Sequence, residues 1–246
     1  MDAILRRVSL WAVVNAASFV RVDDAERETD ACWRDNVTAP VTLAAACRRR
    51  GLPLAMFSSD LVSDGAASRL YVEDDLPNPL SVYGRSKAET ERRVLKLMPQ
   101  ALVIRTSAFF GPWDEANFAT AVWRTLTAGQ PFEAADDAVV SPTYVPDLVN
   151  ATLDLLIDGE GGVWHLANVG AVTWCDFARA LAAAGGLRAD LVRAVSYRQV
   201  WSPAIRPAFS ALGSTHGRLL PPLGDAIANY AGHMLAAAAF DREATS

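Results

Sequence analysis

The sequence predicts an α/β fold with a doubly wound parallel sheet. Short apolar runs typical of buried parallel strands recur at 10–14, 54–57, 101–106 and 163–166. Stretches with a helical pattern separate them, at 25–50, 84–98, 116–128 and 147–157. Parallel strands need long crossover connections, so this alternation favours one sheet with helices on its faces.

Length, composition, net charge and cysteine count limit the class of protein. At 246 residues and 51% hydrophobic content the chain can bury a core, in one or two domains. A net charge of −5 offers no basic surface, so we expect no nucleic-acid partner. Cys32, Cys47 and Cys175 show no pairing by spacing, which favours a reducing compartment.

Targeting and metal signals are missing from the sequence. The N-terminus lacks the long apolar core of a signal peptide, and no run approaches the length of a membrane span. The histidines, of which His165 is most simply a core residue, show no ligand spacing. We therefore expect a cytoplasmic protein with no membrane partner and no catalytic metal.

The first apolar run, Leu10–Val14, ends at three small residues, Asn15, Ala16 and Ala17. Small residues at the carboxyl end of a parallel strand either let a ligand approach or serve packing alone. The helical region that follows, 25–50, carries Pro40 at a permitted first-turn position and stops at Gly51. Asn36, ahead of this proline, is by itself most simply a helix cap.

The second half continues the alternation. The helix at 116–128 ends at Gly129, and a short strand follows at Phe132–Ala135. Thr173 and Asp176 fit a capping box ahead of a helix at 177–184. A last helix is expected at 225–240.

Three polar groups between Phe57 and Lys87 have a chemical relationship. Ser59 follows the strand 54–57, whereas Tyr83 and Lys87 lie four residues apart and share one face of the next helix. A phenol has an ordinary pKa of about 10, and an ammonium group at roughly 4 Å would stabilise the phenolate by at most about 4 kcal/mol. Ser, Tyr and Lys together suit ketone reduction or alcohol oxidation, in which one oxygen gains or loses a proton.

The pattern Y-x-x-x-K alone is weak, because most such pairs lie on a solvated helix face. The context strengthens it here: a serine at the end of a strand, then a turn-rich connection with Gly65, Pro77 and Pro79, then the helix.

These residues stand in runs that resemble a known family. The sequence resembles extended short-chain dehydrogenase/reductases in two runs, M-F-S-S-D-L-V-S-D-G at 56–65 and Y-G-R-S-K at 83–87. The spacing of 24 residues from Ser59 to Tyr83 (83 − 59) also matches that family. Within them the sequence is most similar to the dTDP-4-dehydrorhamnose reductase family. Further matches lie along most of the chain: V-V-N-A-A at 13–17, R-V-D-D-A-E at 21–26, I-R-T-S at 104–107, N-F at 117–118, S-P-T-Y at 141–144 and R-P-A-F-S at 206–210.

The resemblance implies a Rossmann-like dinucleotide-binding domain at 1–108 and a sugar-nucleotide lobe at 109–246, with 144–170 returning to the sheet. It implies NADPH, or NADH, as cofactor and a nucleotide-linked 4-keto-6-deoxy sugar as substrate, in deoxysugar and cell-surface polysaccharide biosynthesis. By the family's mechanism Ser59, Tyr83 and Lys87 are catalytic, and Lys87 lowers the pKa of Tyr83. The cofactor would contact Asn15, Ala16, Ala17, Asn36, Tyr83 and Lys87, with Asn36 supporting Lys87 through a water; the substrate would contact Asp60, Ser107, Asn117 and Arg206.

The sequence departs from the family at its start. No G-x-x-G-x-x-G or G-x-G-x-x-G occurs in the chain, so we expect the first strands of the family's pattern to be absent. The strand at 10–14 would then be a sheet edge, which a second copy or a partner chain could cover. The alternative function is a non-catalytic nucleotide-sugar-binding or regulatory subunit that has lost dinucleotide binding.

Overall fold

The computed structural model describes residues 9–199 and 203–244, and these form two compact units. Unit 1 comprises the described residues of Met1–Thr106, Asn150–Leu166 and Ser202–Gly217. Unit 2 comprises the described residues of Ser107–Val149, Ala167–Trp201 and Arg218–Ser246.

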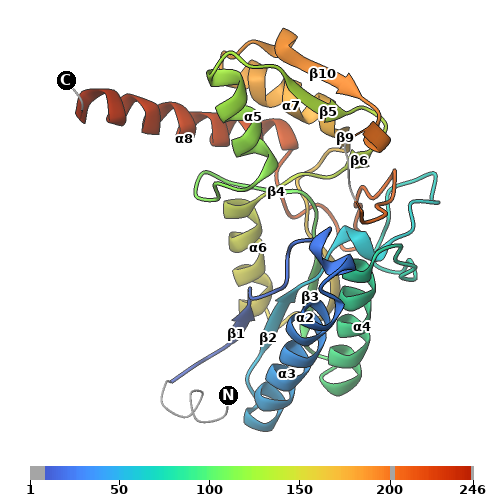
Figure 1. The fold of residues 1–246 in the computed structure, drawn as a ribbon. Helices are drawn as coiled ribbons and strands as arrows, with labels where there is room; N and C mark the ends of the chain where they lie inside the picture. Colours follow the sequence, from blue (N-terminus) through green and yellow to red (C-terminus); the bar gives the residue numbers. More distant parts are fainter. Residues whose placement is uncertain (1–8, 200–202, 245–246) are drawn as a thin grey trace. The chain divides into compact units, whose positions relative to one another are not determined.

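Unit 1 is built on a four-stranded parallel sheet (Figure 1). Its strands are β1 (Val13–Asn15), β2 (Leu54–Phe57), β3 (Leu102–Arg105) and β8 (Gly162–His165), in the order β1-β2-β3-β8. All three pairings are parallel, with Val14 opposite Ala55 and Met56 opposite Val103. The predicted α/β fold with a parallel sheet is confirmed, and β1 ends the sheet within the described residues.

Helices cover the sheet of unit 1. The predicted helical region 25–50 is divided into η1 (Asp24–Glu26), α2 (Thr29–Trp33), a π-helical turn (Arg34–Thr38) and α3 (Ala39–Arg50). Gly51 closes α3 in the left-handed conformation, at φ 63°, as predicted. Helix α4 (Val82–Leu97) packs beside α3, and both contact Leu54 and Met56 of β2 in one buried cluster (Figure 1).

The boundary between the units differs from the expected one in the third segment. Residues 203–217, expected in the lobe, belong to unit 1, because their side chains and backbone bond to it. Leu212 pairs with Tyr71 in an isolated parallel bridge, and Arg206 forms an ion pair with Asp23. Helix α6 (Val145–Ile157) passes from one unit to the other.

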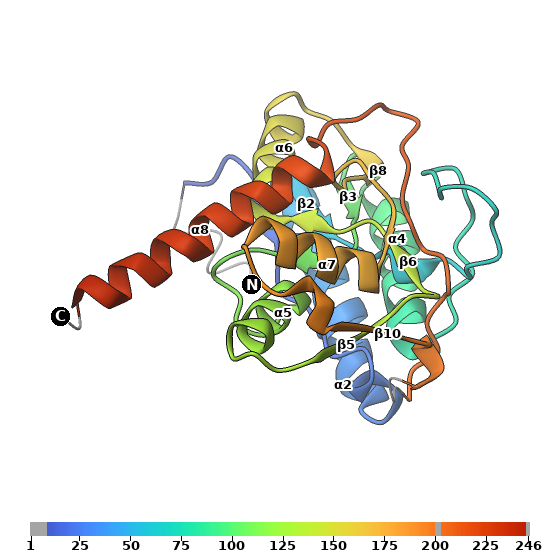
Figure 2. The same ribbon diagram turned by 90° about the horizontal axis from the view of Figure 1, so that it is seen from above.

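Unit 2 has its own core. Helix α7 (Trp174–Ala184) contacts α5 (Phe118–Thr127), α8 (Leu223–Ala244) and the parallel pair β5 (Phe132–Ala135) and β10 (Val192–Val195) (Figure 2). Thr173 caps α7 by accepting a hydrogen bond from the Asp176 backbone N–H at 3.0 Å, as the capping box predicts. Two short pairs complete the unit: β4 (Phe109–Phe110) with β7 (Thr143–Tyr144), and β6 (Val139–Val140) with β9 (Val172–Thr173).

Two further findings concern the class of protein. Cys32, Cys47 and Cys175 are all buried free thiols. In the described part of the chain, no helix is long and apolar enough to cross a membrane.

Candidate functional site

Ser59 lies where the sequence predicts it, directly beyond the carboxyl end of β2. It caps the short helix η3 (Asp60–Val62), because its hydroxyl accepts a hydrogen bond from the Leu61 backbone N–H at 3.1 Å. The same hydroxyl donates to Asp60 Oδ1 at 3.0 Å, and Ser210 donates to Asp60 Oδ2 at 2.5 Å. The buried Asp60 carboxylate thus connects the strand end to residue 210 and orients Ser59.

Tyr83 and Lys87 occupy the first turns of α4, on one face as predicted. The helix begins at Val82, two residues before the predicted start, because the Ser81 hydroxyl accepts from the Gly84 N–H at 3.1 Å and caps it. Glu26 Oε1 accepts from the Val82 N–H at 2.8 Å. A carboxylate at this end also suits the positive pole of the helix.

Gly84 lets the first turn of α4 approach the η3 turn. A Cβ atom at this position would overlap the carbonyl oxygen of Leu61 and come within 2.9 Å of Pro79 Cβ. With no side chain in the way, the Tyr83 phenol comes near enough to the Ser59 hydroxyl for that hydroxyl to lower its pKa. The glycine of the Y-G-x-x-K pattern is therefore a packing requirement of the site.

The electrostatics of the site follow from its burial. Burial raises the pKa of Tyr83 well above its ordinary value of 10, the Asp60 carboxylate raises it further, and the hydrogen bond with Ser59 lowers it. Burial also lowers the pKa of Lys87 from 10.5 to about 8. The Lys87 Nζ lies 5.6 Å from the centroid of the Tyr83 ring, while the net shift of the Tyr83 pKa is upward, so the lowering of this pKa by Lys87 stays a prediction.

Asn36 lies beside Lys87, with a serine between them. Lys87 Nζ donates to Ser18 Oγ at 2.7 Å and to the Phe57 carbonyl at 3.2 Å. Ser18 Oγ donates to Asn36 Oδ1 at 2.8 Å. Sequence reasoning missed Ser18; its signal is a hydroxyl residue directly after the small Ala16-Ala17 pair beyond β1.

Two other expected contacts have partners inside unit 1. Asn15 Oδ1 accepts from the Ala17 N–H at 3.3 Å, in a turn that leaves Ala16 and Ala17 exposed. Arg206, expected to bind the substrate diphosphate, donates to both oxygens of Asp23 at 2.9 and 2.8 Å. A diphosphate would have to compete with this carboxylate for the guanidinium fork.

The remaining two expected substrate residues belong to unit 2. Asn117 caps α5: its Oδ1 accepts from the Thr120 N–H at 2.9 Å, and its Nδ2 donates to the carbonyls of Gly111 and Asp114. The oxygen and the nitrogen of the Asn117 side-chain amide are therefore both hydrogen-bonded to backbone groups. Ser107 is buried.

The residues present fit one end of a nicotinamide dinucleotide. Two features at the carboxyl ends of the strands suit a nicotinamide and its ribose. The side chains of Tyr83 and Lys87 supply polar groups, and the turn at Ala16 and Ala17 supplies exposed backbone. Among the described residues, no Gly-rich turn joins a strand to a helix N-terminus to hold a pyrophosphate. Nor does the described part of the chain contain a group of His, Cys, Asp or Glu side chains that could hold a metal ion.

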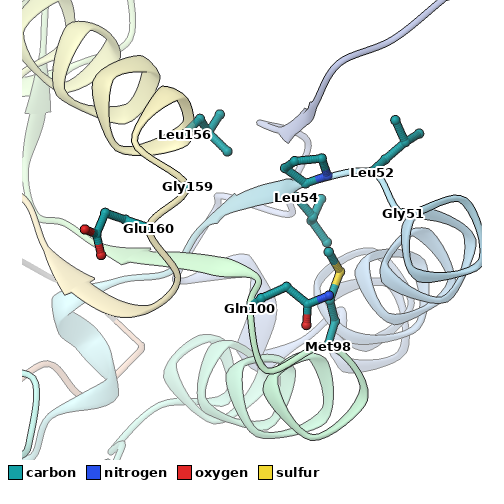
Figure 3. Close-up of a pocket in the computed structure, with 9 residues that line it drawn as sticks. Gly51, Leu52, Leu54, Met98, Gln100, Leu156, Gly159 and Glu160 are labelled. Carbon is teal, nitrogen blue, oxygen red and sulfur yellow. The ribbon is translucent and has the colours of Figure 1, made fainter.

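One pocket lies away from these residues. Its volume is about 150 Å³, and Figure 3 shows it at the amino ends of β2 and β3, between the start of β2, the end of α4 and the end of α6. Ser59 follows the opposite, carboxyl end of β2. The lining is largely apolar, with Leu52, Leu54, Met98 and Leu156, so this pocket contributes nothing to the proton-transfer groups.

Comparison with known proteins identifies the family. The model of the RmlD substrate binding domain matches residues 1–220. The chain belongs to this family.

Relatives and solved structures agree with the assignment. The chain is 40% identical over 219 residues to a dTDP-4-dehydrorhamnose reductase of Mycobacterium tuberculosis, covering 86% of this chain and 72% of the relative. It is 34% identical over 204 residues to a probable low-salt glycan biosynthesis reductase of Haloferax volcanii, covering 81% and 68%. The crystal structure of a Bacillus anthracis dTDP-4-dehydrorhamnose reductase in complex with NADP superimposes with a TM-score of 0.88 at 26% identity, covering 93% of this chain and 83% of that one.

The close approach at Gly84 gives a first prediction. Gly84→Ala forces the η3 turn away from α4, so we expect a loss of about 2 kcal/mol of stability from overpacking, measured by denaturant unfolding. The matched control is Gly232→Ala in α8, where an added Cβ meets nothing within 4 Å. That change should stabilise the chain by up to about 1 kcal/mol. Equal effects of the two substitutions would contradict the packing role of Gly84.

The lowered pKa of Lys87 gives a second prediction. Between about pH 8 and about pH 10 the unfolded chain keeps the Lys87 proton and the folded chain loses it, so this residue makes stability rise with pH, by at most about 3 kcal/mol. Lys87→Met should remove this rise. Unfolding of both proteins across this range measures the difference, and other buried groups contribute equally to both.

Lys96→Met, at an exposed position of the same helix, is the control and should keep the slope of the parent chain. If Lys87→Met also keeps it, Lys87 is not titrating in this range.

Proposed function

We propose that the chain reduces a nucleotide-linked 4-keto-6-deoxy sugar, with a nicotinamide dinucleotide as reductant, in deoxysugar biosynthesis. The observation that carries the proposal is the proximity of the Tyr83 phenol to the Ser59 hydroxyl, with Lys87 one helical turn further along α4. Membership of the family and the names of the relatives support the substrate class.

NADPH, or NADH, supplies a hydride to the keto carbon when bound. The NADP complex of the Bacillus anthracis relative supports this choice of cofactor. Tyr83 and Lys87 would hold the nicotinamide ribose beside the Ala16-Ala17 turn. We propose Asn15 and Asn36 as further residues on the cofactor side.

Tyr83 acts as the general acid in this proposal. As the keto carbon becomes an alcohol carbon, its oxygen gains negative charge and needs a proton. Burial keeps the phenol protonated, which is the state required for donation. Ser59 donates a second hydrogen bond to the same oxygen once its hydroxyl turns from Asp60 to the substrate.

The substrate contacts remain part of the proposal. Asp60 would act through Ser59, because both of its oxygens already accept hydrogen bonds inside unit 1. Arg206 would bind the diphosphate by exchanging Asp23 for phosphate oxygens. Ser107 and Asn117 are further proposed contacts to the sugar nucleotide.

Replacement of the proposed acid tests the function. With dTDP-4-dehydrorhamnose and NADPH, the parent chain should oxidise the cofactor, and Tyr83→Phe should lower kcat by roughly 10²–10⁴-fold with little change in cofactor affinity. Loss of nicotinamide absorbance measures turnover, and nicotinamide fluorescence measures binding.

The matched control is Tyr230→Phe, which removes a buried phenol of α8 that hydrogen-bonds with Thr120 in unit 2. This variant should keep its turnover. A parent chain that binds no cofactor at millimolar concentration, or a Tyr83→Phe variant with full activity, would refute the proposed reaction.

A further inference from the structure

The ammonium group of Lys87 is held by one backbone carbonyl and one side chain. The carbonyl is that of Phe57, the last residue of β2, which accepts at 3.2 Å. The side chain is Ser18, whose hydroxyl accepts at the shorter distance of 2.7 Å. Ser18 comes from the segment after β1, which is 69 residues away in the sequence.

Asn36 determines which way the Ser18 hydroxyl points. A hydroxyl has one hydrogen to donate and two lone pairs to accept with. The hydrogen goes to Asn36 Oδ1 at 2.8 Å, in preference to the Phe19 carbonyl at 3.2 Å. A lone pair of Ser18 therefore faces the ammonium group.

The Asn36 side chain is itself fixed. Its Oδ1 also accepts from the Phe19 N–H at 2.8 Å, and its Nδ2 donates to Ser86 Oγ at 3.0 Å and to the Phe19 carbonyl at 3.2 Å. Ser86 in turn donates to the Tyr83 carbonyl at 2.7 Å, inside the first turn of α4. These hydrogen bonds fix the orientation of the asparagine amide.

We propose that Ser18 is a positioning residue for the reaction, whose hydroxyl, oriented by Asn36, holds the Lys87 ammonium in place beside Tyr83 and keeps it charged. The proposal rests on the proposed reductase function for its catalytic meaning. The Ser18 hydroxyl links the asparagine directly to the lysine.

Burial disfavours the charged form of Lys87, of which only 6% is exposed. Desolvation favours the neutral amine and is the main reason that the pKa of Lys87 falls to about 8, whereas an acceptor for the ammonium opposes this fall. The other titratable groups that face Lys87 are Tyr83, Cys32 on α2 and Glu91 on α4. All three remain in every Ser18 variant.

The chain offers a direct measurement, because Lys87 and Lys96 are its two lysines. Lysine labelled with ¹³C at the ε carbon gives two signals, and Lys96, exposed on the same helix, is the internal reference. We expect Ser18→Ala and the near-isosteric Ser18→Cys to lower the pKa of Lys87 by about one unit, since each removes a good acceptor. Ser18→Thr keeps the hydroxyl and should keep the parent value.

Ser58→Ala is the control for a nearby lost hydroxyl. Ser58 Oγ is buried and has no hydrogen-bond partner among the described residues, one residue beyond Phe57, and its loss should leave the pKa of Lys87 unchanged. A pKa of Lys87 that stays the same in both Ser18→Ala and Ser18→Cys overturns the proposal, as does an equal fall in Ser58→Ala.

Activity provides the second readout. The alkaline limb of the kcat profile should move to lower pH in Ser18→Ala and Ser18→Cys, by the same shift as the titration, and return in Ser18→Thr. A purely structural role would lower kcat without moving this limb, and that result also overturns the proposal. If the parent chain proves inactive, the proposed function fails, while the titration still decides whether Ser18 holds Lys87.

Discussion

The candidate site depends on one close approach, between the first turn of α4 and the η3 turn after β2. Three features produce this approach. Ser81 caps the helix, the Glu26 carboxylate accepts a hydrogen bond from the Val82 N–H, and Gly84 has no side chain to keep the two turns apart. Without this approach, Tyr83 would not reach Ser59, since the two residues belong to different elements joined by a long turn-rich connection. Backbone packing thus determines the position of the reacting groups before any ligand is present.

Burial has opposite consequences for the two titratable groups. It keeps the phenol of Tyr83 protonated and weakens the hold of Lys87 on its proton. The first effect keeps the proton on the acid but makes the phenol a weaker acid, so the charge that develops on the keto oxygen must draw the proton from it. The second effect is a cost that hydrogen-bond acceptors around Lys87 must offset, and Ser18 with the Phe57 carbonyl supplies them. The resting site therefore holds the proton on Tyr83, and Lys87 keeps its charge only with the help of these acceptors.

The strands and helices of the sheet could be predicted from the sequence because their patterns are local. The run Leu54–Phe57 is β2 to the residue, and Tyr83 and Lys87 share a helical face by their spacing alone. The link between Ser18, Asn36 and Lys87 could not be predicted in this way, because it joins three segments far apart in the sequence through side-chain geometry. The raised pKa of Tyr83 could not be predicted for a related reason: spacing shows that a cation is near, whereas the degree of burial decides which effect is larger.

The central claim is that Ser59 and Tyr83 meet at one substrate oxygen. A crystal structure of the Tyr83→Phe variant with NADPH and dTDP-4-dehydrorhamnose tests it directly, because removal of the acid slows turnover enough to retain the substrate. The account predicts that the keto oxygen lies within about 3 Å of Ser59 Oγ and over the edge of the substituted ring at position 83, where the phenol hydroxyl stood. A keto oxygen bound to other groups, away from both side chains, would contradict it.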